Sequence, residues 1–385
     1  MDKSNLKRIG IIGGGQLGKM MIMEAKKMGF YVSILDPAKD CPASSLADKH
    51  LVADFSDRNA IRKLANISNV LTYEFEHIEV EFLKELESSG YKIYPTVQSL
   101  EIIQNKFDQK TLLKKKEIPI PEFRKINKLK EIKETAQKFS FPLMLKSCTG
   151  GYDGKGNYLI SSKKEIKKAF NKLGAGKTSL MAEKYIPFKK EISIIAARSV
   201  NGEMEVYPVA ENDHKNNILY ETKVPAEISS DLKKRAERLA KEVLDVFKGV
   251  GIFCVEMFIT KNNRLLVNEI APRPHNSGHY TIEGCVTSQF EQHIRAIVNL
   301  PLGDPALLRP SVMRNILGSG KEGKAKVAGM ESALKLKGAS IHIYNKTVSR
   351  PERKMGHITV TANNLASAVK RAYKASELIK ITGGN

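Results

Sequence analysis

The sequence predicts an α/β fold, and three observations support this. Over roughly the first hundred residues, short apolar strands alternate with segments whose apolar residues recur at helical spacing. A glycine-rich turn joins the first strand to the first helix. Farther along, hairpin signals flank one long amphipathic helix. With 385 residues, the chain is long enough for two or three domains with separate cores.

The first segment, residues 1–104, is expected to hold a parallel sheet with right-handed crossovers. Its first strand, 8–12, leads into a helix over 16–28. The second strand, 31–35, ends at Asp36. Further strands, with helices between them, are predicted at 51–53, 70–73 and 92–94.

The second segment, residues 105–300, mixes strands and helices, and the third, 301–385, is expected to be a small, mostly β domain. Ser162 and Glu165 indicate a capping box that opens a helix ending near Leu173. Other predicted helices lie at 231–247, 287–300 and 364–377. Predicted strands lie at 141–145, 180–185, 191–198, 204–209, 251–259, 264–270, 340–344 and 356–361.

Composition narrows the class of protein. Residues are 42% hydrophobic and 27% charged, as in globular domains, and no apolar run approaches the roughly 20 residues that span a bilayer. The N-terminus leads into a strand rather than a signal-peptide core, and four scattered cysteines lack metal-ligand spacing. We therefore expect a cytoplasmic protein with no membrane contact.

The net charge of +21 raises the possibility of nucleic-acid binding. However, the lysines alternate with glutamates on predicted helix faces, as in 163–168, and the chain has no Trp and no basic segment interleaved with aromatic residues. Solvated helix surfaces and a few phosphate contacts explain the charge, so no nucleic-acid partner is expected.

Residues 13–18, Gly-Gly-Gly-Gln-Leu-Gly, match the G-x-G-x-x-G dinucleotide fingerprint, with Asp36 at the end of the next strand. By itself this pattern indicates NAD. Its physical basis is broader, because backbone N–H groups at a helix N-terminus attract any phosphate or carboxylate. A nicotinamide enzyme and a plain tight turn therefore remain alternatives.

Residues 146–157 carry four glycines, two lysines and a Tyr-Asp pair after a buried strand. This composition is typical of a loop that holds an anion through backbone N–H groups, although an ordinary hairpin is the simpler alternative. Residues 174–178 only imitate a phosphate-binding loop, because Asn171 stands where its first glycine belongs and a helix precedes it.

Two further constellations carry charge at predicted strand ends. Glu256 and the pair Asn268 and Glu269 lie on adjacent strands that are otherwise apolar, so they need a partner or a metal, and oxygen ligands suit Mg²⁺. Residues 271–280 then crowd Arg273, His275 and His279 together as candidates for anion binding and acid–base work. A zinc site from the two histidines lacks a third ligand.

A basic cluster occupies residues 346–357, around a turn at Arg350-Pro351. Such a cluster is usually a solvated face, but its density favours a phosphate clamp. Its basic members are Lys346, Arg350, Arg353, Lys354 and His357.

Together the motifs at 13–18, 150–157, 183–186, 268–279 and 350–357 resemble the N5-carboxyaminoimidazole ribonucleotide synthases of purine biosynthesis, a family of ATP-grasp ligases. The resemblance covers nearly the whole chain in order. It implies a Rossmann-like preATP-grasp domain, an ATP-grasp domain of two α+β lobes with a lid lobe at about 110–185, and a small C-terminal domain. It also implies carboxylation of 5-aminoimidazole ribonucleotide by bicarbonate and ATP through carboxyphosphate, and a homodimer.

The resemblance implies roles for individual residues. ATP would be held by Lys106, Lys146, the loop Gly151, Tyr152, Asp153, Gly154, Lys155, Gly156 and Asn157, the adenine hinge Glu183, Lys184, Tyr185 and Ile186, and Glu191, His214, Asn268 and Glu269. Mg²⁺ would be held by Glu256, Glu269 and Asn268. The catalytic residues would be Tyr152, Asp153, Arg273 and His275. The ribonucleotide would be bound by Gly15, Gln16, Leu17, Glu74, Glu76, Lys346, Arg353 and Lys354.

Two positions depart from the family pattern: Asn157 stands where we expect Gln, and Glu352 where we expect Gly. Glu352 places a negative charge beside the predicted phosphate clamp. Its effect depends on whether its side chain faces solvent.

Overall fold

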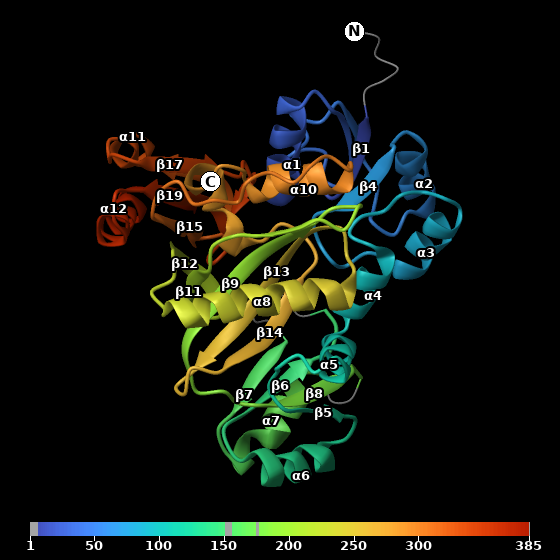
Figure 1. Cartoon of the computed structure of the whole chain (residues 1–385), viewed down its shortest axis with the longest axis vertical. Coiled ribbons are helices and arrows are strands. Elements are labelled where there is room, and N and C mark those ends of the chain that lie inside the picture. Colours follow the sequence, from blue (N-terminus) through green and yellow to red (C-terminus); the bar gives the residue numbers. More distant parts are fainter. Residues whose placement is uncertain (1–6, 151–155, 175–176, 385) are drawn as a thin grey trace.

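The computed structural model describes residues 7–150, 156–174 and 177–384. Its N-terminal part is a parallel sheet in the order β3-β2-β1-β4, at the upper right of Figure 1. The strands are β1 (Arg8–Ile12), β2 (Tyr31–Leu35), β3 (Lys49–Leu51) and β4 (Val70–Tyr73). The prediction for three of these strands is confirmed to the residue. The strand expected at 51–53 instead ends at Leu51.

Four helices accompany this sheet and bury their apolar faces against it. They are α1 (Gln16–Lys27), α2 (Arg58–Asn66), α3 (Val80–Ser88) and α4 (Val97–Gln104). The strand expected at 92–94 is only an isolated bridge from Ile93 to Leu71. The next residue but one, Pro95, has no N–H to extend the pairing.

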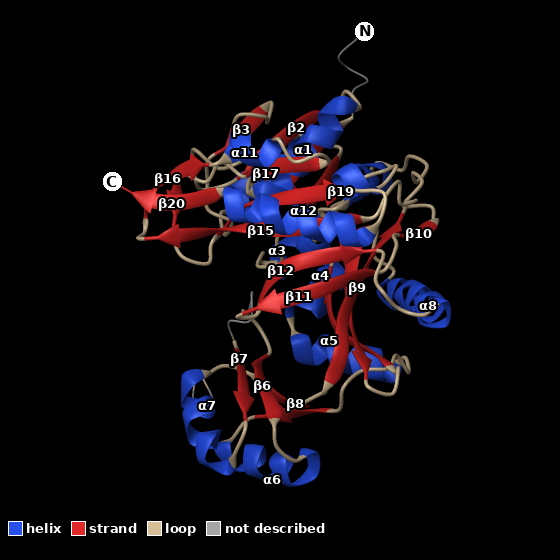
Figure 2. Ribbon diagram, turned by 90° about the vertical axis from the view of Figure 1, so that its left-hand side faces the viewer, coloured by secondary structure: helices blue, strands red, loops and turns tan. Residues whose placement is uncertain are grey.

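The lid lobe is a separate antiparallel sheet in the order β5-β8-β6-β7, at the bottom of Figure 1. Helices α6 (Leu129–Phe139) and α7 (Ile166–Lys172) cover one face of it, as Figure 2 shows, and share its apolar core. The lobe follows α5 (Lys106–Lys115). Its strands are β5 (Phe123–Ile126), β6 (Leu143–Ser147), β7 (Asn157–Ile160) and β8 (Leu180–Lys184).

Two details of the lid lobe differ from expectation. The strand expected at 141–145 begins only at Leu143, after Pro142. The Ser162 side chain makes no capping bond, so the predicted capping box is wrong. Glu165 Oε2 instead accepts the Ser161 N–H at 2.6 Å, and the helix begins with a 3₁₀ turn at Lys163–Glu165.

A twelve-stranded sheet forms the body of the molecule. Its first part follows the order β14-β13-β9-β11-β12, with β10 added beside β9. Helix α8 (Ser230–Phe247) packs its apolar face on this sheet. The strands are β9 (Phe188–Arg198), β10 (Met204–Val206), β11 (Ala210–Lys215), β12 (Ile218–Val224), β13 (Gly251–Thr260) and β14 (Leu265–Ala271). Both predicted hairpins are confirmed.

The connection after β14 contains the 3₁₀ turn η3 (Asn276–Gly278), α9 (Thr281–Gly284) and α10 (Gln289–Ile297). The sheet then continues into the C-terminal segment, because β15 (Ser311–Gly320) pairs with β12. The remaining elements are β16 (Gly323–Ala328), α11 (Met330–Leu334), β17 (Ala339–Ile343), β18 (Val348–Ser349), β19 (Lys354–Thr361), α12 (Leu365–Leu378) and β20 (Lys380–Gly384).

The third segment is therefore hydrogen-bonded to the second across one continuous sheet. The domain boundaries at 104 and 300 stay predictions. In the described part of the chain, no helix is both long enough and apolar enough to cross a membrane.

Candidate active site

The glycine turn before α1 is closed by side chains of the protein itself. Asp36 Oδ2 accepts the Gly14 N–H at 2.8 Å, while the Glu74 carboxylate accepts the N–H groups of Gly15 and Gly18. Burial raises the pKa of Glu74, against these hydrogen bonds. An internal carboxylate thus occupies the helix N-terminus that a dinucleotide pyrophosphate would need, which argues against the NAD interpretation.

The predicted metal ligands come together at the paired strands β13 and β14. Glu256 lies directly opposite Glu269 in the register, and a bulge follows at Met257. Burial, and then the nearby charge of Glu269, raises the pKa of Glu256 to about 7. Two carboxylates forced together in this way, with the Asn268 amide beside them, fit a divalent cation, which would relieve their repulsion.

Both predicted phosphate lysines reach the same place. Lys106 Nζ lies 2.7 Å from Glu269 Oε1, and Lys146 Nζ donates to Asn268 Oδ1 at 3.4 Å. The charge of Lys106 outweighs the effect of burial and keeps the pKa of Glu269 below its usual value. Four cationic or metal-binding groups therefore converge here: Lys106 from α5, Lys146 from β6, and Asn268 and Glu269 from β14.

A buried ion triad lies behind this point. The Glu183 carboxylate is 3% exposed as a residue and lies 2.5 Å from Lys110 Nζ on one side and 2.5 Å from Lys146 Nζ on the other. Burial by itself would raise the pKa of Glu183, but the two lysines outweigh it and lower that pKa to about 2. The side chain of Glu183 is thus engaged by the two lysines, and the adenine contact predicted for this residue stays a prediction for its backbone alone.

Sequence reasoning missed Lys110, although a signal was present. It follows Lys106 by four residues on α5, and side chains at that spacing share one helix face. The i, i+4 spacing from Lys106 therefore indicated that Lys110 lies on the same face of the helix, toward the same site.

The rest of the predicted adenine hinge borders a recess of about 400 Å³. Lys184, Tyr185 and Ile186 line it on one side, and Leu266 of β14 on another. The predicted ribose residue Glu191 accepts a hydrogen bond from His214 Nδ1 at 2.6 Å. Burial lowers the pKa of His214, but Glu191 outweighs it, and the net shift is upward.

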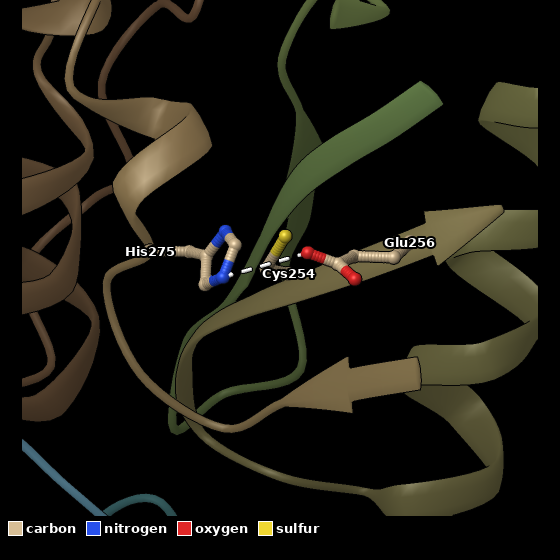
Figure 3. A group of neighbouring side chains, drawn as sticks. All are labelled: Cys254, Glu256 and His275. Carbon is tan, nitrogen blue, oxygen red and sulfur yellow. Dashed lines mark ion pairs between the residues drawn. The ribbon is translucent and has the colours of Figure 1, made fainter. Parts of the chain in front are cut away.

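The segment after β14 carries Arg273 and His275, and it places His275 beside Glu256. Arg273 Nε lies 2.9 Å from Glu76 Oε1, which joins this segment to the N-terminal sheet. Figure 3 shows His275, Cys254 and Glu256 directed toward one another, with His275 Nε2 3.5 Å from Glu256 Oε1. Burial, followed by the charges of Arg273 and Lys354, lowers the pKa of His275 well below its usual value.

A fully buried glutamine fixes the backbone of this segment. Gln289 Oε1 accepts the His275 N–H at 2.9 Å, and Gln289 Nε2 donates to the His275 carbonyl at 2.8 Å. A side chain at Gly278 would place its Cβ 2.3 Å from Gln289 Oε1, so this clamp requires glycine there. Sequence reasoning gave no sign of Gln289.

His279, the second histidine of the segment, faces elsewhere. It is 1% exposed and packs against Phe290 and His357, away from Glu256. The zinc alternative built on His275 and His279 therefore has no geometric support. His357 is also buried, and its Nδ1 pairs with the Tyr344 hydroxyl at 2.9 Å, so the expectation that it joins the basic cluster is wrong.

The other basic residues lie in and beside the turn between β18 and β19. Lys346 Nζ donates to the Lys354 carbonyl at 2.8 Å, and Arg353 Nη1 donates to the Val348 carbonyl at 2.6 Å. The charge of Lys346 acts on Glu74, and that of Lys354 acts on His275 and His214. Lys346 is thus close enough to influence the glycine turn, and Lys354 close enough to influence His275 and His214.

Glu352 adopts φ +64°, in the left-handed region that favours glycine, which explains why glycine was expected there. Its carboxylate accepts a hydrogen bond from Asn216 at 3.1 Å. In the predicted lid, Gly156 has φ +93° and Asn157 begins β7 opposite Lys146. The other predicted lid residues, Gly151, Tyr152, Asp153, Gly154 and Lys155, lie outside the described residues.

Family models match the chain in three consecutive parts. A ribonucleotide synthetase preATP-grasp domain matches residues 6–104, an ATP-grasp domain matches 111–290, and a phosphoribosylaminoimidazole carboxylase C-terminal domain matches 311–371. The N5-carboxyaminoimidazole ribonucleotide synthase of Bacillus subtilis is 45% identical over 351 residues, 91% of this chain and 90% of that protein. The chain belongs to the N5-carboxyaminoimidazole ribonucleotide synthase family.

Solved structures of this family agree along the whole fold. The synthetase from Thermotoga maritima superposes with a TM-score of 0.90 at 46% identity, covering 98% of this chain and 100% of that one. The synthase from Aspergillus clavatus, in complex with ADP and 5-aminoimidazole ribonucleotide, gives a TM-score of 0.89 at 37% identity, covering 97% and 98%. The ATP-grasp architecture expected from the sequence is confirmed.

Proposed function

We propose that this protein is an ATP-dependent ligase that joins bicarbonate to the exocyclic amine of 5-aminoimidazole ribonucleotide. The products are N5-carboxyaminoimidazole ribonucleotide, ADP and phosphate. One observation carries the proposal: Glu256 and Glu269 face each other, with Lys106 on Glu269, Lys146 on the neighbouring Asn268, and His275, two residues after Arg273, on Glu256. The first group suits nucleotide phosphates, and the second suits a small anion.

Within this function, the residues at the nucleotide end neutralise charge. Glu256, Glu269 and Asn268 would hold Mg²⁺, which supplies Lewis-acid neutralisation of the ATP phosphates when bound. Lys106 and Lys146 add positive charge at the same oxygens. The backbone of Glu183, Lys184, Tyr185 and Ile186 would hydrogen-bond adenine beside the recess, with Glu191 and His214 at the ribose.

At the other end, Arg273 offers a planar fork to bicarbonate and to carboxyphosphate, the proposed intermediate. Its ion pair with Glu76 fixes the orientation of that fork. Residues 151–157 would form a lid that excludes water, because carboxyphosphate hydrolyses readily, with Tyr152 and Asp153 reaching the second substrate.

The ribonucleotide would lie between the N-terminal sheet and the basic turn. Gly15, Gln16, Leu17 and Glu76 would line its pocket, with the 5′-phosphate on Lys346, Arg353 and Lys354. Glu74 would act indirectly, since its carboxylate already holds the N–H groups of Gly15 and Gly18.

A phosphate-release assay with Mg-ATP and bicarbonate tests the proposal. Release should require 5-aminoimidazole ribonucleotide, and the carboxylated product should form in step with it. Phosphate release that does not depend on the ribonucleotide, or that requires a different amine, would instead identify another ATP-grasp ligase. No turnover with any amine would support the weaker alternative, a nucleotide- or RNA-binding protein without catalysis.

Replacing Glu269 by Gln should lower kcat by at least about a thousandfold while leaving the fold intact, because one metal-binding carboxylate is lost. Circular dichroism and the urea midpoint serve as the fold controls. Exposed Glu242→Gln on α8 is the matched substitution and should keep full activity. Full activity of the Glu269 variant would remove the metal argument.

We also propose a homodimer in the cytoplasm. Family membership supports the first, and four buried free cysteines are compatible with a reducing compartment. Sedimentation equilibrium across a range of concentrations tests the dimer, and a monomer at every concentration would contradict it.

A further inference from the structure

His275 makes two hydrogen bonds through Nδ1, and one of them has a fixed direction. The backbone N–H of Ser277 donates to His275 Nδ1 at 3.3 Å, so the histidine acts as the cap of the 3₁₀ turn η3. The Ser277 hydroxyl lies 2.9 Å from the same nitrogen. A backbone N–H can only donate, so Nδ1 must be the unprotonated nitrogen of the ring.

A chain of hydrogen bonds between buried side chains leads to the Ser277 hydroxyl. Ser193 Oγ donates to Ser277 Oγ at 2.8 Å, Asn212 Nδ2 donates to Ser193 Oγ at 2.8 Å, and Thr222 Oγ1 donates to Asn212 Oδ1 at 2.9 Å. All four residues are at most 5% exposed. Ser277 Oγ also lies 3.6 Å from Cys254 Sγ. With Ser193 and the Cys254 thiol both donating to Ser277 Oγ, the Ser277 proton is directed to Nδ1.

The proton of the neutral ring must then lie on Nε2, which faces Glu256 Oε1 at 3.5 Å (Figure 3). We propose that His275 serves the reaction as an N–H donor through Nε2, and that Ser277 is the positioning residue that fixes this tautomer. The inference rests on the proposed function for its ligand, an oxygen of bicarbonate or of carboxyphosphate. It leaves the amine proton to a group other than His275.

The same contact decides against a transition-metal site here. Cys254, Glu256 and His275 bring one ligand atom each within 4.8 Å of one another, a spacing that suits a metal. A metal bound to Nε2 would require the ring proton to be on Nδ1. That proton would then point at the Ser277 N–H, which is directed at the same nitrogen. This contact therefore argues against a metal held through His275 and leaves Glu256 for the proposed Mg²⁺ site.

The direct test reads the tautomer in the intact protein. Long-range ¹H–¹⁵N spectra of ¹⁵N-histidine-labelled protein at mildly alkaline pH distinguish the two tautomers, and the signals missing from His275→Gln assign the residue. We expect protonation at Nε2 only. Protonation at Nδ1 would overturn the inference, and since no turnover is needed, that result is separate from any failure of the proposed activity.

A pair of substitutions tests the donor role in turnover. His275→Gln keeps an N–H donor at the end of the side chain but no base, whereas His275→Glu offers a base and no donor. The Gln variant should retain at least about tenfold more kcat than the Glu variant, roughly one charge-assisted hydrogen bond. The reverse order would show that His275 accepts the proton.

Ser277→Ala and Tyr207→Phe separate positioning from stability. Both remove a buried, hydrogen-bonded hydroxyl and should lower the urea midpoint to a similar extent, but the Tyr207 hydroxyl bonds the Thr287 carbonyl, outside the chain that leads to Ser277. Only Ser277→Ala should lower kcat, by about tenfold, with the KM for ATP nearly unchanged. Equal effects of the two variants on kcat would reduce Ser277 to a structural role and contradict the proposal.

Discussion

The side chain of Glu183 has a structural role that its place in a motif did not reveal. The sequence placed it in the adenine hinge, but its carboxylate lies between Lys110 and Lys146 with almost no exposure to water. Without this carboxylate two like charges would face each other in a dry environment, which is costly. Glu183 is thus the group that lets two lysines approach the nucleotide site together.

Replacing Glu183 by Gln should therefore lower the free energy of unfolding by about 3 kcal/mol or more, measured by urea titration. The matched control is Lys184→Met, which breaks the exposed pair of the next residue with Glu122 and should change stability by less than about 1 kcal/mol. Similar losses in both variants would contradict the triad.

The pKa of Glu183 also gives this stabilisation a pH dependence. The folded-state pKa, about 2, lies below that of the unfolded chain, so the stabilisation is fully present above the unfolded value and disappears as the pH falls toward 2. The wild-type protein should lose stability over this acid range more steeply than Glu183→Gln. Parallel pH profiles of the two proteins would contradict this.

At position 352 the family pattern led us to expect glycine, and the backbone conformation of Glu352 gives the physical reason. At φ +64° an L side chain is strained by roughly 1–2 kcal/mol, and glycine is not. Glu352→Gly should raise the free energy of unfolding by about 1 kcal/mol relative to Glu352→Ala, because both lose the bond to Asn216 and only glycine relieves the strain. Thermal unfolding of the two variants measures the difference, and equal stabilities would rule the strain out.

At the scale of elements, the turn between β1 and α1 carries a phosphate-binding pattern whose donors are already satisfied. Its N–H groups bind Asp36 and Glu74, which fastens α1 to the ends of β2 and β4. Family resemblance at the level of the motif could not reveal this, because Glu74 is distant in sequence. These contacts therefore fix the position of Gly15, Gln16 and Leu17, which we propose line the ribonucleotide pocket.

Gly13→Ala tests how tightly that turn is built. Gly13 has φ +109°, and a Cβ there would lie 2.3 Å from Glu74 Cγ. We expect a loss of about 3 kcal/mol, from backbone strain together with the clash. Gly90→Ala is the control, since Gly90 has φ +91° with open space around its Cβ, and should cost only about 1 kcal/mol. Equal losses would show that Glu74 does not pack against the turn.

At the scale of the molecule, the C-terminal segment completes cores that begin elsewhere. Tyr344, which follows β17, is 2% exposed and packs in the N-terminal core beside Phe290 and Val250, while β15 extends the central sheet from β12. The segment therefore contributes to folding of the whole chain as well as to the basic turn.

Tyr344→Ala should accordingly lower the free energy of unfolding by about 3–5 kcal/mol and keep a single cooperative transition, as a cavity in a shared core does. Tyr373→Ala on α12, where the side chain is exposed, should cost less than about 1 kcal/mol. A separate early transition in the Tyr344 variant would show that the C-terminal segment unfolds independently.

The sequence by itself determined three strands and the first helix of the N-terminal part, both hairpins of the body and the placement of Glu256 and Glu269 on adjacent strands. These depend on periodicity, turn residues and adjacency, which are local in sequence. Only the tertiary structure decided that Glu74 closes the glycine turn, that Lys110 shares Glu183, and that Ser277 and Gln289 hold His275. Each of these last contacts satisfies a buried polar group with a partner from another element or from the next turn of the same loop, and burial is a property of the packed chain that no local pattern records.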